Sequence, residues 1–334
     1  MAQRKYAIAI AATAGLALYA AAAVVAATVA RAEIKIVATI KPIHALVAGV
    51  TEGIATPELL VSGSASPHTF TLTPDGARSL HGASVFFRVS PTVEPFTERI
   101  LTALPLSVRV VTLADAPGVA TLALRRSDTF EAHDHATDDL QASSSGTPGS
   151  ADAPRTGDGH VWLDPENAKA MVTEIARVLS EVSPSDAPRL ADNARHVIAG
   201  IDALSQEITA NLSGLGNRPY VVFHDAYHYF EHRYGLTPVG AITIGPEYQP
   251  GARRLSELRH KIAGLGAVCV FAEPQFSPRV VAAVTEGTPA RFGTLDPEGA
   301  LVAAGPGAYT QLLRNLSLNL RECLSAEGVT GEGG

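Results

Sequence analysis

Short runs of β-branched and aromatic residues alternate with helix-periodic stretches along most of this chain, and this alternation constrains the fold more than any other feature. In the first half, four runs are expected to be strands: Ile34–Thr39, Glu58–Val61, Ser84–Val89 and Ser107–Leu113. The stretches between and after them are expected to be helices: Ile43–Val50, Asp75–Leu80, Val93–Leu104 and Asn167–Leu179. Strand–helix–strand units of this kind predict an α/β fold with mainly parallel sheets.

The second half alternates in the same way. Its expected strands are Tyr220–Phe223, Val239–Ile244, Ala267–Ala272 and Arg291–Leu295. Its expected helices are Asp225–Tyr234, Ala252–Ala263, Pro278–Glu286 and Tyr309–Leu324. Between the halves, apolar residues recur every three or four positions from Pro188 to Leu215, which predicts one long helix. We therefore expect two Rossmann-like α/β lobes, 33–187 and 216–334, joined by a long rigid helix over 188–215.

The first 32 residues have the pattern of a secretory signal peptide. Arg4 and Lys5 precede a nearly unbroken apolar run from Ile8 to Val29, and Ala30-Arg31-Ala32 provides a small-residue cleavage site. We expect cleavage after Ala32 and export to the periplasm. The alternative is an uncleaved membrane anchor, because the apolar run approaches the length of about 20 residues that spans a bilayer.

The segment 127–159 is rich in Asp, Ser, Gly, Ala and Thr, and we expect a disordered acidic loop there. His133 and His135 lie in it and could form an auxiliary metal site, or simply belong to a solvated loop. The whole chain of 334 residues contains 26 Lys and Arg and 33 Asp and Glu, which gives a formal net charge of −7. This charge balance argues against a nucleic-acid partner, which would need a basic face.

Histidines provide the strongest candidates for chemistry. His44, His68, His160 and His224 stand at the ends of predicted strands or in the loops after them, where open α/β sheets place their ligands. A competing set is His224, His228 and His232, which would line one helix face, but Asp225 stands where a zinc-protease motif has Glu. We expect His228 and His232 to be exposed helix residues. The sequence has no nucleophile elbow, phosphate loop or dinucleotide fingerprint.

The two cysteines, Cys269 and Cys323, form an even pair in a chain expected to be exported. An oxidising compartment favours one disulfide, and two buried thiols are the alternative. Neither cysteine has a second Cys or a His close to it in the sequence, so neither is expected to bind a metal.

Several segments together resemble the periplasmic solute-binding proteins of metal-uptake ABC transporters, of the high-affinity zinc-uptake (ZnuA-like) type. The segments that carry the resemblance are Val222-Phe223-His224-Asp225-Ala226-Tyr227, Pro246-Glu247-Tyr248-Gln249-Pro250-Gly251-Ala252, Cys269-Val270-Phe271-Ala272-Glu273-Pro274-Gln275-Phe276, Gly293-Thr294-Leu295-Asp296-Pro297 and His160-Val161-Trp162-Leu163-Asp164-Pro165. Blocks in this order cover almost all of the chain after the signal segment. They are more specific than any single motif.

The resemblance implies a fold of two lobes with a metal ion in the cleft between them. It implies His68 and His160 as ligands from the first lobe and His224 from the second, with Asp296 or water as the fourth ligand, since Pro67 stands where some relatives have Glu. It also matches Cys269 with Cys323 as a disulfide seen in some relatives. The implied function is capture of Zn²⁺ for a membrane ABC permease by a monomer that is not an enzyme.

Three imidazoles and one oxygen suit tetrahedral zinc, whereas manganese prefers more oxygen ligands. Copper and nickel would also bind such a set. Two other functions remain open at this point. One is a zinc-dependent hydrolase with Glu273 or Asp296 as general base, and the other is a metal-binding adhesin of the same fold.

Overall fold

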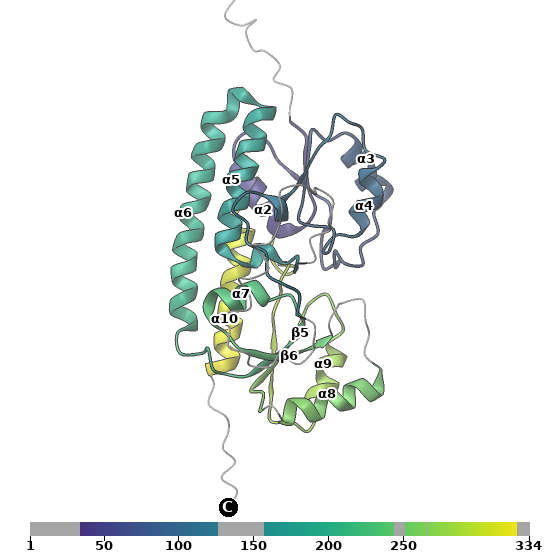
Figure 1. The fold of residues 1–334 in the computed structure, drawn as a ribbon, viewed down its shortest axis with the longest axis vertical. Coiled ribbons are helices and arrows are strands. Elements are labelled where there is room, and N and C mark those ends of the chain that lie inside the picture. The colour runs from purple at the N-terminus through teal and green to yellow at the C-terminus, as the bar shows by residue number, and fades with distance from the viewer. Residues whose placement is uncertain (1–33, 126–156, 244–250, 265, 326–334) are drawn as a thin grey trace, which may run out of the picture. The chain divides into compact units, whose positions relative to one another are not determined.

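Two four-stranded sheets, each made of parallel strands, organise the protein in a computed structural model (Figure 1). The structure describes residues 34–125, 157–243, 251–264 and 266–325. Each of the eight predicted strands overlaps a strand of one of these sheets, which confirms the predicted parallel α/β class. The predicted signal peptide, 1–32, lies outside the described residues.

The N-terminal sheet has the strand order β2-β1-β3-β4, with all neighbours parallel. Its strands are β1 (Ile36–Ala38), β2 (Glu58–Leu59), β3 (Val85–Arg88) and β4 (Arg109–Thr112). The central strands β1 and β3 are buried along their whole length, as expected when helices cover both faces of a parallel sheet. The accompanying helices are α2 (Lys41–Val50), α3 (Pro74–His81) and α4 (Phe96–Leu101).

The C-terminal sheet repeats this plan with the order β6-β5-β7-β8. Its strands are β5 (Tyr220–His224), β6 (Pro238–Thr243), β7 (Cys269–Ala272) and β8 (Arg291–Thr294). The helices of this half are α7 (His228–Tyr234), α8 (Ala252–Gly264), α9 (Pro278–Thr285) and α10 (Ala308–Ser325). In both sheets the first strand of the half lies inside the sheet, so crossover connections are required.

The predicted long helix is α6 (Ala187–Leu212), and it follows α5 (Pro165–Val182) (Figure 1). The amide of Asn193 donates hydrogen bonds to the carbonyl oxygens of Val50 and Glu52, next to the N-terminal sheet. Near its other end, Glu207 pairs with Arg314 of α10. The helix thus contacts both halves. It ends three residues before the predicted Leu215, because Gly214 adopts a left-handed φ of 79°.

Several loops hold the two halves together. Lys41, at the start of α2, donates to the carbonyl oxygens of Gly299, Ala300 and Val302. The indole of Trp162, in the short 3-10 helix η3 (Val161–Leu163), donates to the carbonyl oxygen of Pro297 at 2.8 Å. The segment after β8 is therefore fixed to residues of the first half, although it belongs to the second half in sequence. The lobe boundaries at 187/188 and 215/216 remain predictions.

A disulfide joins Cys269 of β7 to Cys323 of α10, and both residues are buried. The sequence separation is 54 residues, and closing such a loop in the unfolded chain contributes about 4 kcal/mol in the chain-entropy account. This bond ties the inner strand β7 to the helix that packs against its sheet.

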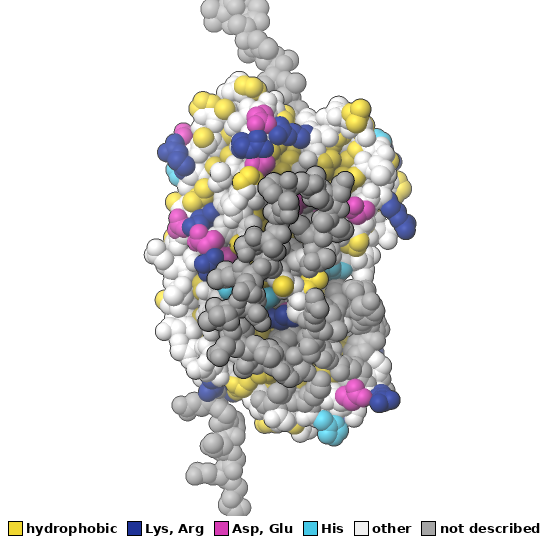
Figure 2. Space-filling model, viewed as in Figure 1, with side chains coloured by type: hydrophobic (Ala, Val, Ile, Leu, Met, Phe, Trp, Pro, Cys, Tyr) yellow, Lys and Arg dark blue, Asp and Glu magenta, His cyan; other side chains and the backbone are white. Residues whose placement is uncertain are grey.

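Most of the predicted acidic loop, with His133 and His135, lies outside the described residues, and only its last residues belong to them. Gly157 forms a β-bridge with Ala123, and the N–H of Asp158 donates to the carbonyl oxygen of Leu122 at 2.9 Å. Figure 2 shows acidic and basic side chains interspersed over the described surface that is visible in that view. Among the described residues, no helix is long and apolar enough to cross a membrane.

Candidate metal centre

Three of the four candidate histidines converge. His68 lies in the turn region after β2, His160 directly precedes η3, and His224 is the last residue of β5. The Nε2 atoms of His68 and His160 are 3.3 Å apart, and those of His160 and His224 are 3.4 Å apart. One nitrogen from each ring lies within 4.8 Å of the other two. The side chains thus come from both halves of the molecule.

These separations match the geometry of a shared tetrahedral ion. Two nitrogens bound to one zinc ion at about 2.0–2.1 Å and at the tetrahedral angle lie roughly 3.3 Å from each other. His160 and His224 are buried and His68 is half-buried, so the nitrogens face a largely enclosed space. The arrangement can therefore hold one small cation with three nitrogen ligands.

Carboxylates orient two of the three rings. Asp158 Oδ1 lies 2.7 Å from His160 Nδ1, and Glu273 Oε1 lies 2.7 Å from His224 Nδ1. A carboxylate beside Nδ1 accepts the ring proton there and leaves Nε2 as a free lone pair, which is the form that binds a metal. His68 instead has a hydrogen bond to the backbone of Thr92.

The electrostatic surroundings differ among the rings. Burial, together with the neighbouring imidazoles of His160 and His224, lowers the pKa of His68 to about 2. Burial also lowers the pKa of His224, but the charge and the hydrogen bond of Glu273 outweigh it and raise that pKa overall. His68 is consequently neutral at every physiological pH, whereas the Glu273 carboxylate favours protonation of His224.

Asp296 is not part of the histidine group. Its Oδ1 accepts hydrogen bonds from the Gln275 amide and from the N–H of Glu298, and its Oδ2 accepts from the N–H of Leu301. These bonds form the turn whose carbonyl oxygens receive Lys41. Asp296 thus has a structural role that its position in the sequence did not reveal.

The remaining histidine predictions have mixed outcomes. His44 Nε2 donates to the carbonyl oxygen of Pro57 at 3.0 Å, so it is a core residue. His224 ends a strand and α7 begins only at His228, so His224, His228 and His232 do not line one helix face. The expectation that His228 is exposed is wrong: it is buried, with its Nδ1 3.9 Å from Asp158 Oδ2, whereas His232 is exposed.

The sequence prediction missed Asp158, which the acidic composition of 127–159 concealed. A usable signal was the pattern Asp158-Gly159-His160, in which an acid stands two residues before a candidate ligand. Glu273 was predicted only as a possible general base of a hydrolase, and its hydrogen bond to His224 was not predicted.

Two further acids near the site, Asp225 and Glu231, both pair with the guanidinium of Arg125. Arg125 Nη1 lies 2.8 Å from Asp225 Oδ1 and 2.8 Å from Glu231 Oε2. Burial raises the pKa of Asp225 to about 6, and the charge of Arg125 opposes that shift. The charge of Asp225, next to His224 in the chain, is thus shared with a guanidinium.

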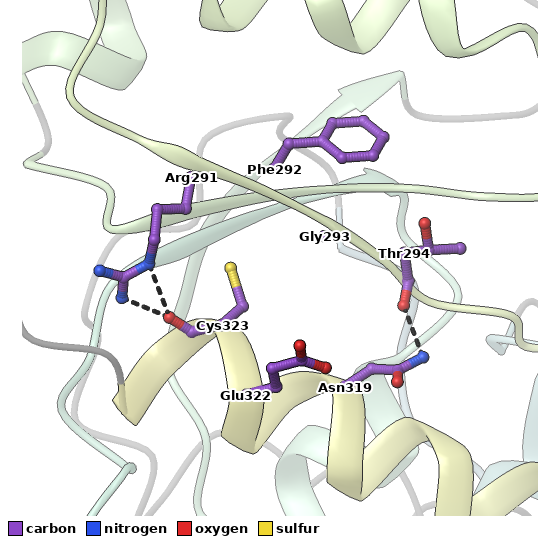
Figure 3. A pocket seen from close by; sticks show the side chains of 7 residues that line it. All are labelled: Arg291, Phe292, Gly293, Thr294, Asn319, Glu322 and Cys323. Atoms are coloured by element: carbon purple, nitrogen blue, oxygen red, sulfur yellow. Dashed lines mark hydrogen bonds between the residues drawn. The ribbon is translucent and has the colours of Figure 1, made fainter.

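A hollow of about 500 Å³, separate from the histidine group, lies between β8 and α10 (Figure 3). It is lined by Arg291, Phe292, Gly293, Thr294, Asn319, Glu322 and Cys323. Its Arg291 guanidinium donates to the carbonyl oxygen of Cys323, and the Asn319 amide donates to that of Thr294. Because these polar groups bond to the backbone, the pocket has no convergent set of free ligands comparable to the three imidazoles.

Comparisons with known proteins identify the family and the fold. The sequence model of the family described as zinc-uptake complex component A, periplasmic, matches residues 36–323. The high-affinity zinc uptake system protein ZnuA of Brucella suis biovar 1 is 39% identical over 305 residues, an alignment that covers 87% of this chain and 91% of the relative.

Two solved structures have the same fold. A crystal structure of ZnuA superimposes with a TM-score of 0.71 at 22% identity, covering 87% of this chain and 99% of that one. A laminin-binding adhesin from Streptococcus agalactiae superimposes with a TM-score of 0.69 at 21% identity, with the same coverage. At such identities the likeness establishes the fold, which is shared by proteins with different names.

Proposed function

The chain belongs to the family of periplasmic zinc-uptake complex component A proteins, and from that premise we propose that it captures Zn²⁺ between its two sheets and delivers it to the membrane permease of an ABC transporter. The observation that carries the proposal is the triangle of Nε2 atoms at 3.3 and 3.4 Å. Zinc is here the cargo, and His68, His160 and His224 are its proposed ligands.

The fourth position is proposed to be water. Asp296 lies outside the close group of three histidines, and both of its oxygens accept hydrogen bonds from its own turn and from Gln275. Three imidazoles with one solvent ligand satisfy the tetrahedral preference of zinc. A set so rich in nitrogen is poorly suited to manganese, while nickel and copper would bind it in vitro.

Ligands from both halves explain how a transporter could distinguish the loaded protein. A cation joins His224 of the C-terminal sheet to His68 and His160 of the other half, so binding favours the arrangement in which the halves are close. A permease that contacts both halves would then recognise the loaded state. The long helix α6, which contacts both, would limit the size of the movement.

The remaining parts of the proposal follow from the sequence. Residues 1–32 are proposed to be a signal peptide that is cleaved after Ala32, so that the mature protein is exported to the periplasm. The mature protein is proposed to be a monomer. The family consists of transport components, and no observation favours the hydrolase: Glu273, one candidate base, is engaged with His224, and Asp296 is engaged with its own turn. The auxiliary role of His133 and His135 also remains a proposal.

Alanine variants of the three histidines test this function. In calorimetric titrations against a zinc chelator of known affinity, His68→Ala, His160→Ala and His224→Ala should each weaken zinc binding at least tenfold, because each removes a metal–nitrogen bond. His196→Ala, in an exposed position of α6, is the matched control and should bind zinc like the wild type. Unchanged titrations for all three ligand variants would rule out this site.

A further inference from the structure

Asp158 and Glu273 are the carboxylates that lie directly against two rings of the histidine group. Each is almost fully buried, at 2% and 3% exposure, and each lies against the Nδ1 atom of a proposed ligand. Asp158 also accepts the N–H of His160 at 3.0 Å. Within the described residues, the ion-pair partners of both carboxylates are imidazoles, with no guanidinium or ammonium among them.

Three other acids near the site have different partners. Asp225 and Glu231 share the guanidinium of Arg125. Asp296 accepts two backbone N–H groups and an amide. The carboxylates of Asp158 and Glu273 thus lie one imidazole ring away from the metal position, and no guanidinium or ammonium of the described residues pairs with them.

We propose that Asp158 and Glu273 determine the specificity of the site for a divalent ion over a monovalent one. With three neutral imidazoles, the two carboxylates give the group a formal charge of −2, which a divalent cation cancels and a monovalent cation does not. This inference rests on the proposed function. It adds to the ligand residues a reason why the site prefers an ion of charge +2.

The discrimination follows from how electrostatic attraction scales. Imidazole nitrogen binds zinc and copper ions alike, so three such nitrogens alone would also accept Cu⁺. The attraction between a carboxylate and the ion is proportional to the charge of the ion. Each carboxylate therefore contributes twice as much free energy for Zn²⁺ as for Cu⁺. If its removal weakens zinc binding by some factor, Cu⁺ binding should weaken by only the square root of that factor.

The test measures both affinities in variants that keep the shape of the site. Asp158→Asn and Glu273→Gln retain an oxygen that can accept the Nδ1 proton but remove the charge. Loss of such a partner weakens metal binding roughly 10–100-fold, so we expect that range for Zn²⁺ and about 3–10-fold for Cu⁺, measured anaerobically against a Cu⁺ chelator. The ratio of the two affinities should then change in favour of Cu⁺ by about 3–10-fold in each variant.

Two controls separate charge from position. Asp202→Asn removes a carboxylate from the exposed part of α6, where it pairs with Lys169, and should leave both affinities unchanged. Glu273→Asp keeps the charge on a shorter side chain, so its ratio of Zn²⁺ to Cu⁺ affinity should change less than that of Glu273→Gln. Equal weakening of Zn²⁺ and Cu⁺ in Asp158→Asn and Glu273→Gln would overturn the inference.

Failure of the inference can be distinguished from failure of the function. A wild-type protein that binds zinc, together with variants whose affinity ratio is unchanged, contradicts only the role of the two carboxylates. A wild-type protein that does not bind zinc contradicts the proposed function itself. The two variants are measured separately, so that if one does not fold, the other still decides.

Discussion

Gly159 separates the carboxylate of Asp158 from the ligand His160, and the structure leaves no room for a side chain there. A Cβ atom at this position would lie 2.6 Å from Val93 Cγ2 and 2.7 Å from Ser90 Oγ, and closer still to Thr92 Oγ1. Gly159→Ala should therefore lower the free energy of unfolding by about 1–3 kcal/mol, the usual cost of overpacking, and weaken zinc binding by displacing His160. Urea denaturation and zinc titration measure the two effects.

The matched control for this prediction is Gly200→Ala. Gly200 lies in α6, and a Cβ atom there would have no other atom within 4 Å, so the change should raise stability by up to about 1 kcal/mol through helix propensity. Zinc affinity should stay as in the wild type. If the Gly159→Ala protein had wild-type stability and zinc affinity, the turn could accommodate a side chain and the prediction would be wrong.

Glu94 is a second residue whose burial has a measurable effect. Burial raises its pKa to about 7, and the N–H groups of Val89 and Ser90, which donate to its Oε2, only partly oppose the shift. Between its ordinary pKa of 4.5 and about 7, the folded protein binds a proton at Glu94 that the unfolded chain has lost. The contribution of Glu94 to stability should therefore fall by about 3 kcal/mol as the pH rises through this range.

Glu94→Gln provides the comparison, because the amide keeps the shape and does not titrate. The free energy of unfolding of the variant, minus that of the wild type, should increase from pH 4.5 to pH 8, as measured by urea denaturation at several pH values. Taking this difference cancels the titration of all other groups. A difference that is constant over the range would mean that Glu94 does not carry the proton.

At the scale of elements, the strands were predictable because buried β-branched runs bounded by turns have few alternatives. The ends of the helices were harder to predict. The predicted helix Val93–Leu104 is shortened to α4 (Phe96–Leu101), since Glu94 turns back to cap the end of β3. The predicted helix Asp225–Tyr234 begins only at His228, because the N–H of Ala226 donates to the carbonyl oxygen of His224 in a turn.

In the candidate site, too, some residues could be predicted from the sequence and others could not. His68, His160 and His224 could be selected because they follow strands, and the topology of parallel sheets brings strand ends together. The roles of Lys41 and Asp296 depend on a contact between segments more than 250 positions apart, between Lys41 and the turn at 299–302, that no local pattern encodes. Asp158 was missed because the residues before it have the composition of a solvated loop, and because no local pattern predicts its contact with the distant His228.

For the whole molecule, the position of the site between the two sheets predicts that zinc stabilises both halves together. Binding to the folded state alone adds about 2.7 kcal/mol when free zinc is 100 times its dissociation constant. In a chain of this size that corresponds to a rise of roughly 4 °C in the unfolding midpoint. The ion links His224 to His68 and His160, so neither half should unfold without losing it.

Two probes can follow this coupling. The chain has a single tryptophan, Trp162, whose ring centroid lies 5.3 Å from that of His160 and whose indole donates to Pro297. Its fluorescence reports the junction between the halves, while far-UV circular dichroism reports the helices of both. With zinc, both transitions should move upward together, and excess chelator should reverse the shift. At the same free zinc concentration, His224→Ala should show a smaller shift in both. If zinc moved only one of the two transitions, the ion would be held within one half, and the bridging geometry proposed for transport would be wrong.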